Sequence, residues 1–360
     1  MKNPISNVST GGLLATREPT RSVGKSSMRA GGRHFALHTL SASLLLAIAS
    51  GAHAEPAGGV VTNGTANIAT TGVNTTITQT TSNVAINWQS FSIGAGETVQ
   101  FVQPDSNSVA LNRVIGSDPS VIQGSLNANG RVFLLNPNGV LFGNAASVNV
   151  GGLIASTMSI TDADFMAGNY VFTDAGTGSV VNEGSITAAD GGFVALMGRS
   201  VSNQGLIAAR LGTVALSAGN AVTLDVAGDG LLNVSITQGA VDALVENGGL
   251  IRADGGQVLL TARAAGDLLN TVVNNTGVIQ AHTIDNRNGS IRLLGDLQSG
   301  TVNVGGTLDA GAPAGGVGGS VETSATEVFI DPAALVTTAA ADGTSGEWLI
   351  GMQDFTVGSA

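Results

Sequence analysis

The stretch Asn182-Glu183-Gly184-Ser185-Ile186-Thr187-Ala188 contains the pattern that decides the fold of this chain. Its last five residues follow the pattern Gly-x-(Ile or Leu)-x-Ala, which occurs six times, beginning at Gly124, Gly184, Gly205, Gly249, Gly277 and Gly306. A close variant begins at Gly152, and four of the glycines are preceded by an asparagine two positions earlier, at Asn182, Asn203, Asn247 and Asn275. Because side chains alternate across a β-strand, each copy predicts a short strand whose Ile or Leu and Ala point inward. We expect the glycines and asparagines to form corners, since both tolerate a positive φ.

A second alternating pattern, Gly-x-(Val or Ile)-x-Leu, follows several copies of the first, beginning at Gly192, Gly212, Gly256 and Gly289. Successive glycines of the first pattern, with the Gly152 variant included, are 28, 32, 21, 44, 28 and 29 residues apart. We therefore expect one coil of roughly 20–30 residues per copy. We interpret the 44-residue interval as two coils, one of which has lost the pattern.

Stacked coils account for these repeats better than other all-β or helical folds do. A single coil cannot bury its apolar face, whereas coils stacked on one another bury it as a solenoid. No aromatic residue occurs between Val194 and Val328, as expected for a narrow interior filled by Val, Ile, Leu and Ala. No proline occurs from Asn138 to Ala312, which suits uninterrupted strand ladders, and no long helical periodicity is present. The sequence predicts an all-β chain folded as a right-handed parallel β-helix.

The first 54 residues have the composition of a secretory signal peptide. Six basic residues and one acidic residue precede an apolar run over residues 35–48. Small residues at Ala52 and Ala54 then form a signal-peptidase site, so we expect the mature chain to begin at Glu55. The alternative, a transmembrane anchor, needs about 20 apolar residues, and this run is shorter and interrupted by polar residues.

The rest of the chain divides into three segments. Residues 55–193 hold nine of the twelve aromatic residues that follow the signal, and we interpret them as an N-terminal cap of extra strands with the first coils. Residues 194–310 contain the regular coils. Residues 311–360 begin with a glycine-rich loop and then start further coils. We expect the natural protein to continue past Ala360, because Gly346–Phe355 reads as another strand with no polar cap after it.

The composition after the signal excludes several classes of function. Eight arginines and no lysine face 24 carboxylates, a net charge near −16, so the surface repels nucleic acid and anionic lipid. There is no cysteine and only one histidine, His282, so zinc sites and Cys–His or Ser–His catalysis are not expected. Asp162, Asp164 and the Asp225–Asp229 segment suggest calcium, but a calcium loop needs more oxygen ligands in register. We therefore predict no catalytic site, no cofactor and no metal.

The sharpest local motif is Asn136-Pro137-Asn138-Gly139, which lies between the apolar runs 131–135 and 140–142. Asn at the first position, Pro at the second and Gly at the fourth match a type I β-turn. Considered alone, these four residues predict a structural turn without chemistry.

Together with residues upstream, the motif resembles the haemagglutination-activity domain of two-partner secretion exoproteins, the filamentous haemagglutinins and the high-molecular-weight adhesins. The likeness covers most of residues 60–310, and the long basic signal peptide is also typical of that family. The second Asn-Pro-Asn-Leu motif of the haemagglutinin branch is missing, which favours the high-molecular-weight adhesin branch. The residues that carry the likeness are Trp88, Phe91, Phe101, Asn112, Arg113 and the Asn136–Gly139 turn.

The resemblance implies a right-handed β-helix with an N-terminal cap, export to the periplasm, and recognition by an outer-membrane transporter with periplasmic docking domains. It makes the turn formed by Asn136, Pro137, Asn138 and Gly139 the expected transporter-recognition element. The chain would then be the secretion signal and folding nucleus of a secreted or surface-exposed adhesin, and not an enzyme. The surface ligand of such an adhesin is not indicated by these residues.

Two alternatives stay open at this point. A secreted carbohydrate-active β-helix would show a cluster of carboxylates on one face of the solenoid. An autotransporter passenger would need a C-terminal membrane barrel in the same chain.

Overall fold

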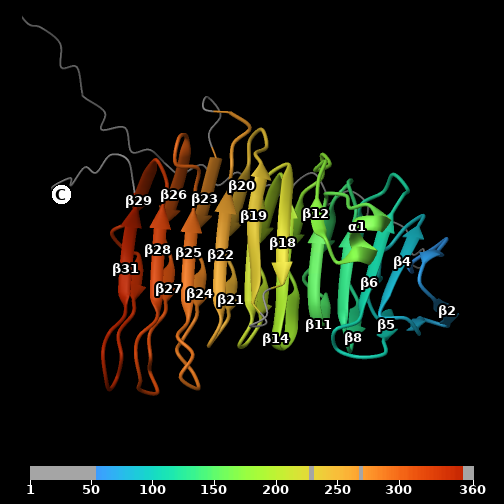
Figure 1. Ribbon diagram of the computed structural model, residues 1–360, viewed down its shortest axis with the longest axis horizontal. Coiled ribbons are helices and arrows are strands. Elements are labelled where there is room, and N and C mark those ends of the chain that lie inside the picture. The colour runs from blue at the N-terminus through green and yellow to red at the C-terminus, as the bar shows by residue number, and fades with distance from the viewer. Residues whose placement is uncertain (1–53, 227–230, 267–270, 352–360) are drawn as a thin grey trace, which may run out of the picture. The chain divides into compact units, whose positions relative to one another are not determined.

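Copies of the Gly-x-(Ile or Leu)-x-Ala pattern pair with one another in parallel in the computed structural model, which describes residues 54–226, 231–266 and 271–351. Ile207 lies in register between Ile186 of the previous coil and Ile251 of the next. Ile279 and Leu308 continue the same buried row. The predicted parallel β-helix is therefore confirmed, and Figure 1 shows the strands of successive coils side by side.

Three ladders form three faces of the solenoid, which we name A, B and C, and the chain visits them in the order C, B, A within each coil. Face A contains β4 (Asn83–Trp88), β6 (Val109–Val114), β9 (Arg131–Leu135), the second halves of β11 (Ser147–Ser156) and β14 (Ser185–Gly198), β17 (Thr213–Ala218), β22 (Gln257–Ala262), β25 (Ser290–Leu294), β28 (Ser320–Ser324) and β31 (Glu347–Gly351).

Face B contains β3 (Asn74–Gln79), β5 (Thr98–Val102), β8 (Ser125–Ala128), the first halves of β11 and β14, β16 (Leu206–Ala208), β21 (Leu250–Arg252), β24 (Val278–Gln280), β27 (Thr307–Asp309) and β30 (Leu335–Thr337). Face C contains β7 (Ser120–Ile122), β10 (Val140–Phe142), β13 (Val180–Asn182), β15 (Ser200–Asn203), β20 (Leu244–Asn247), β23 (Thr271–Asn275), β26 (Gly300–Val304) and β29 (Glu327–Ile330).

The N-terminal end of the solenoid is covered by antiparallel strands. β1 (Val60–Asn63) pairs with β4 of face A, and β2 (Ala66–Thr71) pairs with β3 of face B. These strands confirm the predicted cap of extra strands. The boundary that we placed after residue 193 falls within β14, and the parallel ladders run on both sides of it.

The interior is filled by rows of aliphatic side chains of similar size. On face A the row runs through Val194, Val214 and Val258 to Ile291 and Val321. Face C carries an equivalent row of valines, at Val180, Val201, Val245, Val273 and Val302. All of these side chains are buried in one continuous core, so each coil supplies the apolar surface on which the next one packs.

The glycines of the first pattern form a column at the corner between faces C and B, but not for the reason that we predicted. None of them has a positive φ. A Cβ placed on Gly205 would overlap the carbonyl oxygen of Gly184 in the coil before it, and Gly249 meets Gly205 in the same way. Gly277 and Gly306 continue the column. These positions require glycine because corners of neighbouring coils approach too closely for any side chain.

The asparagines that precede these glycines form a buried ladder. Asn182 Nδ2 donates to Asn203 Oδ1 over 2.7 Å, Asn203 donates to Asn247 over 2.8 Å, and Asn247 donates to Asn275 over 2.7 Å. The four side chains are at most 1% exposed. Each amide therefore satisfies its neighbour, which removes most of the cost of burying a polar group.

Two of our assignments of coils were wrong. The Gly152 variant lies on face A, paired with β9 and with Phe193–Met197, whereas the face B position of that coil is taken by Val148. The 44-residue interval is one coil, because Leu206 pairs directly with Leu250. Its extra length is the hairpin of β18 (Ala221–Val226) and β19 (Leu232–Gln238). Strands on faces A and B alternate alike, and so do those of the hairpin, so alternation alone cannot separate them.

The insertions leave the solenoid at one corner, between faces A and C. The first contributes α1 (Asp162–Ala167) and β12 (Tyr170–Phe172), and β12 pairs antiparallel with β18 of the second to give a small sheet. Thr161 caps α1 at its N-terminus and Gly168 caps its C-terminus. Among the described residues, no helix is both long enough and apolar enough to cross a bilayer.

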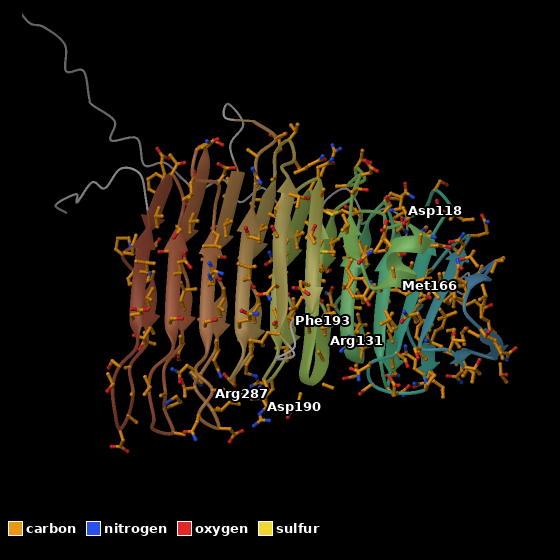
Figure 2. The ribbon with its side chains drawn as sticks, in the orientation of Figure 1. Asp118, Arg131, Met166, Asp190, Phe193 and Arg287 are labelled. Atoms are coloured by element: carbon orange, nitrogen blue, oxygen red, sulfur yellow. The ribbon has the colours of Figure 1, made fainter. Side chains whose placement is uncertain are left out.

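The insertions bury the outer side of face A, where a second core forms. Outward side chains of five successive strands pack against α1, β12, β18 and β19, at Leu111, Phe133, Ile154, Ala195 and Ala215. Phe133 lies 6.0 Å from Phe165 of α1 and 5.3 Å from Tyr170 of β12, ring centroid to ring centroid, and burial raises the pKa of the Tyr170 hydroxyl. Figure 2 shows Arg131 beside Phe193, whose ring centroid lies 5.6 Å from the guanidinium carbon. These aromatic residues thus cover a flank of the solenoid, and not its end as we expected.

One carboxylate joins the cap, the solenoid and the first insertion. Asp162 accepts hydrogen bonds from Arg113 of β6 at 2.9 Å, from Asn63 of β1 at 2.6 Å and from Thr62 at 3.1 Å. Arg113 also donates to the carbonyl oxygen of Ile160. Burial alone would raise the pKa of Asp162, but the hydrogen bond and the charge of Arg113, helped by Thr62 and Asn63, outweigh burial and lower it.

Replacing Gly249 by alanine should lower the free energy of unfolding by about 1–3 kcal/mol, because the new methyl group would have to push apart two coils. Denaturant unfolding of a protein that consists of residues 55–360 measures the change. Gly266→Ala is the matched control, since a Cβ there would meet no atom within 4 Å. Equal behaviour of the two variants would contradict the column.

Asn247→Ala should cost about 1–3 kcal/mol, because it removes the buried hydrogen bond that Asn203 donates to the next coil and the one that Asn275 accepts. The matched control is Asn149→Ala, which removes an exposed asparagine from β11. Thermal unfolding followed by circular dichroism compares the two. A ladder that contributes nothing would give both variants the same melting temperature.

Asp162→Asn should lower stability by about 1 kcal/mol at neutral pH, because Arg113 loses its charged partner. The folded-state pKa of Asp162 is lowered, so its contribution is present above the unfolded-state pKa of about 3.9 and is lost as pH falls through the folded-state value. Denaturant unfolding at several pH values should therefore show the two proteins converging in acid. A gap that stays constant down to the lowest pH would rule out this linkage.

Candidate functional site

The Asn136–Gly139 motif forms the corner between faces A and C that joins β9 to β10. The Gly139 main-chain N–H donates to the Asn136 carbonyl oxygen over 3.0 Å, which closes the predicted turn. Gly139 has a φ of 117°, a conformation that favours glycine. The turn therefore has a backbone geometry that the residue types explain.

The two asparagine amides of the turn are used inside the protein. Asn136 Nδ2 donates to the Asp118 carbonyl oxygen and to Ser120 Oγ, both at 3.0 Å, and Asn138 Nδ2 donates to the Gly116 carbonyl oxygen at 3.0 Å. These partners belong to the same corner of the preceding coil, where Figure 2 labels Asp118. The Asn136 side chain is fully buried. Neither amide is therefore free to recognise another molecule without breaking an internal contact.

The turn is held from the following coil as well. Asn136 N–H donates to the Ser156 carbonyl oxygen over 2.9 Å, and Gly178 N–H donates to the Pro137 carbonyl oxygen over 3.1 Å. A Cβ on Gly178 would overlap the backbone of the turn. The turn thus clamps three consecutive coils at one corner, and of its four residues only Pro137 is exposed.

The upstream residues that carry the family likeness build the interior of the first coils. Trp88 Nε1 donates to Asn112 Oδ1 over 3.0 Å, and the rings of Trp88 and Phe91 meet edge to face at 5.4 Å. Phe101 is fully buried in the same core. Arg113 holds Asp162, as described above. The structure brings Trp88, Phe91 and Asn112 together, but it places them in the core and separate from the Asn136–Gly139 corner.

The partners of the turn were missed at the sequence level. Gly116, Asp118 and Ser120 lie 16 to 22 residues before the turn asparagines that contact them, and their loop has no motif of its own. Two of the three accept through main-chain oxygens, which every residue type possesses, so residue identity carries no signal there. Gly176 and Gly178, two glycines shortly before β13, were a possible signal, since a Cβ on either would overlap the backbone of the turn.

The predicted signal-peptidase site lies at the edge of what the structure describes. Ala54 and Glu55 are described as irregular, half-buried residues before the cap. Ala52 and the remainder of the predicted signal peptide lie outside the described residues.

The polar clusters elsewhere on the described surface are small. His282 Nε2 lies 2.9 Å from Asp309 Oδ2, and its Nδ1 lies 3.8 Å from Asp254 Oδ1, so the ring separates the two carboxylates. Arg210 pairs with Asp190 and Asp285 on the same corner, between faces B and A, and these hydrogen bonds and charges raise the pKa of Arg210. Among the described residues, no three His, Asp or Glu side chains gather as metal ligands would.

Comparison with known proteins identifies a family that this chain matches. Residues 52–310 match the TPS secretion domain family. The chain is 39% identical over 251 residues to a heme/hemopexin-binding protein of Haemophilus influenzae, covering 67% of this chain and 27% of that protein. A second heme/hemopexin-binding protein of Haemophilus influenzae is 35% identical over 251 residues, covering 63% of this chain and 26% of that protein. The chain therefore spans about a quarter of the length of these relatives.

A solved structure agrees with the fold. The crystal structure of the HMW1 secretion domain from Haemophilus influenzae superimposes with a TM-score of 0.72 at 31% identity, covering 82% of this chain and 76% of that one. The family match covers the cap, the Asn136–Gly139 corner and the coils up to residue 310. The chain therefore belongs to the TPS secretion domain family, the domains that send large two-partner-secreted exoproteins through the periplasm to the cell surface or the medium.

Proposed function

We propose that the Asn136–Gly139 corner makes this unit the folding nucleus of its exoprotein. The observation that supports the proposal is the use of both asparagine amides to hold the preceding coil while Pro137 holds the following one. The first complete coils are thereby fixed in register beside the antiparallel cap. Each later coil then finds a finished apolar row and an open ladder on which to stack.

The partner that reads this unit is the outer-membrane transporter of the two-partner secretion pathway, through its periplasmic docking domains. Membership of the family supports a transporter partner. The corner between faces A and C supports the location, because the exposed Pro137 and the insertions lie along it. The acidic, lysine-free composition of the mature chain agrees with a protein partner and argues against nucleic acid.

The exoprotein that this unit leads is a surface adhesin. Its resemblance to the high-molecular-weight adhesins supports this proposal, as does the lack of a metal-binding cluster among the residues that the structure describes. An enzyme on the same fold would need paired carboxylates on one face. Along the corner between faces B and A, carboxylates are instead paired with Arg210 or separated by His282.

Asn136→Ala should destabilise the unit by about 2 kcal/mol, since it deletes the hydrogen bonds to Asp118 and Ser120 and those that Asn136 Oδ1 accepts from Asn138. It should also reduce secretion several-fold in cells that contain the transporter. Immunoblots of the medium and the periplasm measure secretion, and denaturant unfolding of the purified mature chain measures stability.

Asn149→Ala is the control, because it changes an exposed residue away from the Asn136–Gly139 corner and should alter stability by less than about 0.5 kcal/mol. Under the clamp proposal it is secreted normally. A stable Asn136→Ala protein that is not secreted would point to direct recognition of the asparagine. Normal secretion of an unstable Asn136→Ala protein would remove the turn from the export mechanism.

A further inference from the structure

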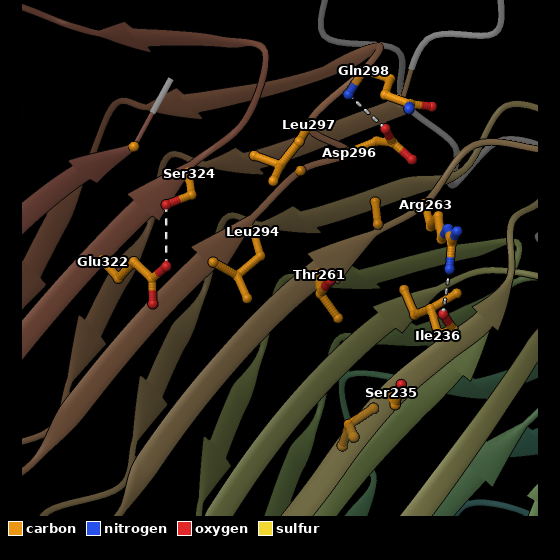
Figure 3. A pocket seen from close by; sticks show the side chains of 14 residues that line it. Ser235, Ile236, Thr261, Arg263, Leu294, Asp296, Leu297, Gln298, Glu322 and Ser324 are labelled. Atoms are coloured by element: carbon orange, nitrogen blue, oxygen red, sulfur yellow. Dashed lines mark hydrogen bonds between the residues drawn. The ribbon is translucent and has the colours of Figure 1, made fainter. Parts of the chain in front are cut away.

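A groove of about 840 Å³ lies on the outer side of face A, between β19 and the turn after β25. Its three charged side chains all have hydrogen-bond partners in the groove wall, as Figure 3 shows. The pairs are Arg263 with Ile236, Asp296 with Gln298, and Glu322 with Ser324. The charges of the groove are therefore used internally, and the outer side of face B is the stronger candidate for an interaction surface.

Face B carries an apolar row on its outer side from β16 to β30. On each of these five strands, the residue just before the buried one points outward, because side chains alternate along a strand. Strand register aligns Leu206, Leu250, Val278, Thr307 and Leu335 in this row. Val278 and Leu335 are 40% and 56% exposed, whereas the same row is hydrophilic in the preceding coils, at Ser147 for example. A contiguous exposed apolar row of this kind indicates a contact surface.

A second outward row runs beside the apolar one, two residues further along each strand. It consists of Ala208, Arg252, Gln280, Asp309 and Thr337. Arg252 and Asp309 are the only charged residues in the two rows, so this patch is neutral in an otherwise strongly acidic chain.

Both charges on the patch can bind a further group. Arg252 is exposed, and its guanidinium has no carboxylate partner among the residues that the structure describes. Asp309 is 30% exposed, and its oxygens meet His282 Nε2 and the Gly311 main-chain N–H. A carboxylate can accept about four hydrogen bonds, so Asp309 retains the capacity to bind a cation from outside.

The two charges are placed symmetrically about the middle strand of the patch, β24, which carries Val278 and Gln280. Arg252 lies one coil before this strand and Asp309 one coil after it. A two-fold axis along β24, between two facing copies, puts Val278 opposite Val278 and Arg252 of each copy opposite Asp309 of the other. An axis along the solenoid would instead put Arg252 opposite Leu250 and bring like charges to the same level. Charge complementarity therefore favours a second copy in the antiparallel arrangement.

We propose that two copies of this chain associate face to face through the outer side of face B, from β16 to β30, with their solenoids antiparallel. The apolar rows of the two copies pack against each other, and Arg252 of each copy pairs with Asp309 of the other. Five coils at about 4.8 Å give a patch roughly 24 Å long, which is small for a permanent interface. The association is therefore reversible and increases with the concentration of the chain.

Cysteine crosslinking of the full chain tests the facing position. The chain contains no cysteine, so Val278→Cys gives each copy a single thiol on the proposed axis. Ser147→Cys is the matched control, because Ser147 is exposed in the same outward row, on β11. Each chain is produced with its signal peptide, recovered from cells and medium together, and treated with a short bismaleimide. We expect about fivefold more covalent dimer from Val278→Cys than from Ser147→Cys. Equal yields, or no dimer at either position, would overturn the proposal.

A charge exchange tests the pairing of Arg252 with Asp309. In the Val278→Cys chain, Arg252→Asp places two carboxylates opposite each other and Asp309→Arg places two arginines opposite each other. Either change alone should therefore lower the dimer yield about fivefold. A mixture of the two singly changed chains restores both opposite-charge pairs, so the yield should return to within about twofold of the original, as a dimer with one copy of each. A misfolded chain would not recover on mixing. Unchanged yields in the single variants, or no recovery in the mixture, would show that the two charges do not meet.

Discussion

Parallel hydrogen bonding between coils fixes their separation at about 4.8 Å, and the rest of the structure depends on that distance. At the corners it leaves no room for a Cβ between neighbouring backbones, so glycine recurs at Gly205, Gly249 and Gly277. In the interior this separation brings like side chains of neighbouring coils into contact, so rows of valine or isoleucine pack closely. A buried amide can persist there because the next coil presents its complement at hydrogen-bonding distance.

The three corners of the solenoid differ in what they tolerate. The corner between faces C and B is tight, since the Asn ladder and the glycine column meet there. The corner between faces A and C admits insertions of very different length, and those insertions fold back over face A. A repetitive scaffold thus acquires a distinct flank, with its own aromatic core, without any break in the ladders. The Asn136–Gly139 turn lies where that flank begins.

The fold could be predicted from the sequence because short local patterns specify its strands and recur along the chain. Six copies of one alternating pattern specify the strands, and the residue types exclude most competing architectures. The assignment of coils at Gly152 and over the 44-residue interval was wrong because alternation identifies a strand but not the face to which it belongs. The reason for glycine was also misjudged. Gly205 is required by the close approach of the Gly184 backbone, 21 residues earlier, and not by a positive φ of its own. For the candidate site, the turn itself was predicted, but its partners were not, because Asp118 and Gly116 act through carbonyl oxygens.

The asparagine ladder also gives the solenoid a direction. Every side-chain amide in it donates toward the C-terminal side, from Asn182 to Asn203, then to Asn247 and to Asn275. The amide dipoles consequently add head to tail, as hydrogen-bonded chains of like polarity do. The ladder is therefore not symmetric between its two ends: each asparagine offers an amide hydrogen to the coil that follows and its oxygen to the coil that precedes. While these four coils stack from the N-terminal side, each finished coil presents an amide N–H to the asparagine of the next one, and the ladder ends where Val304 occupies the position after Asn275.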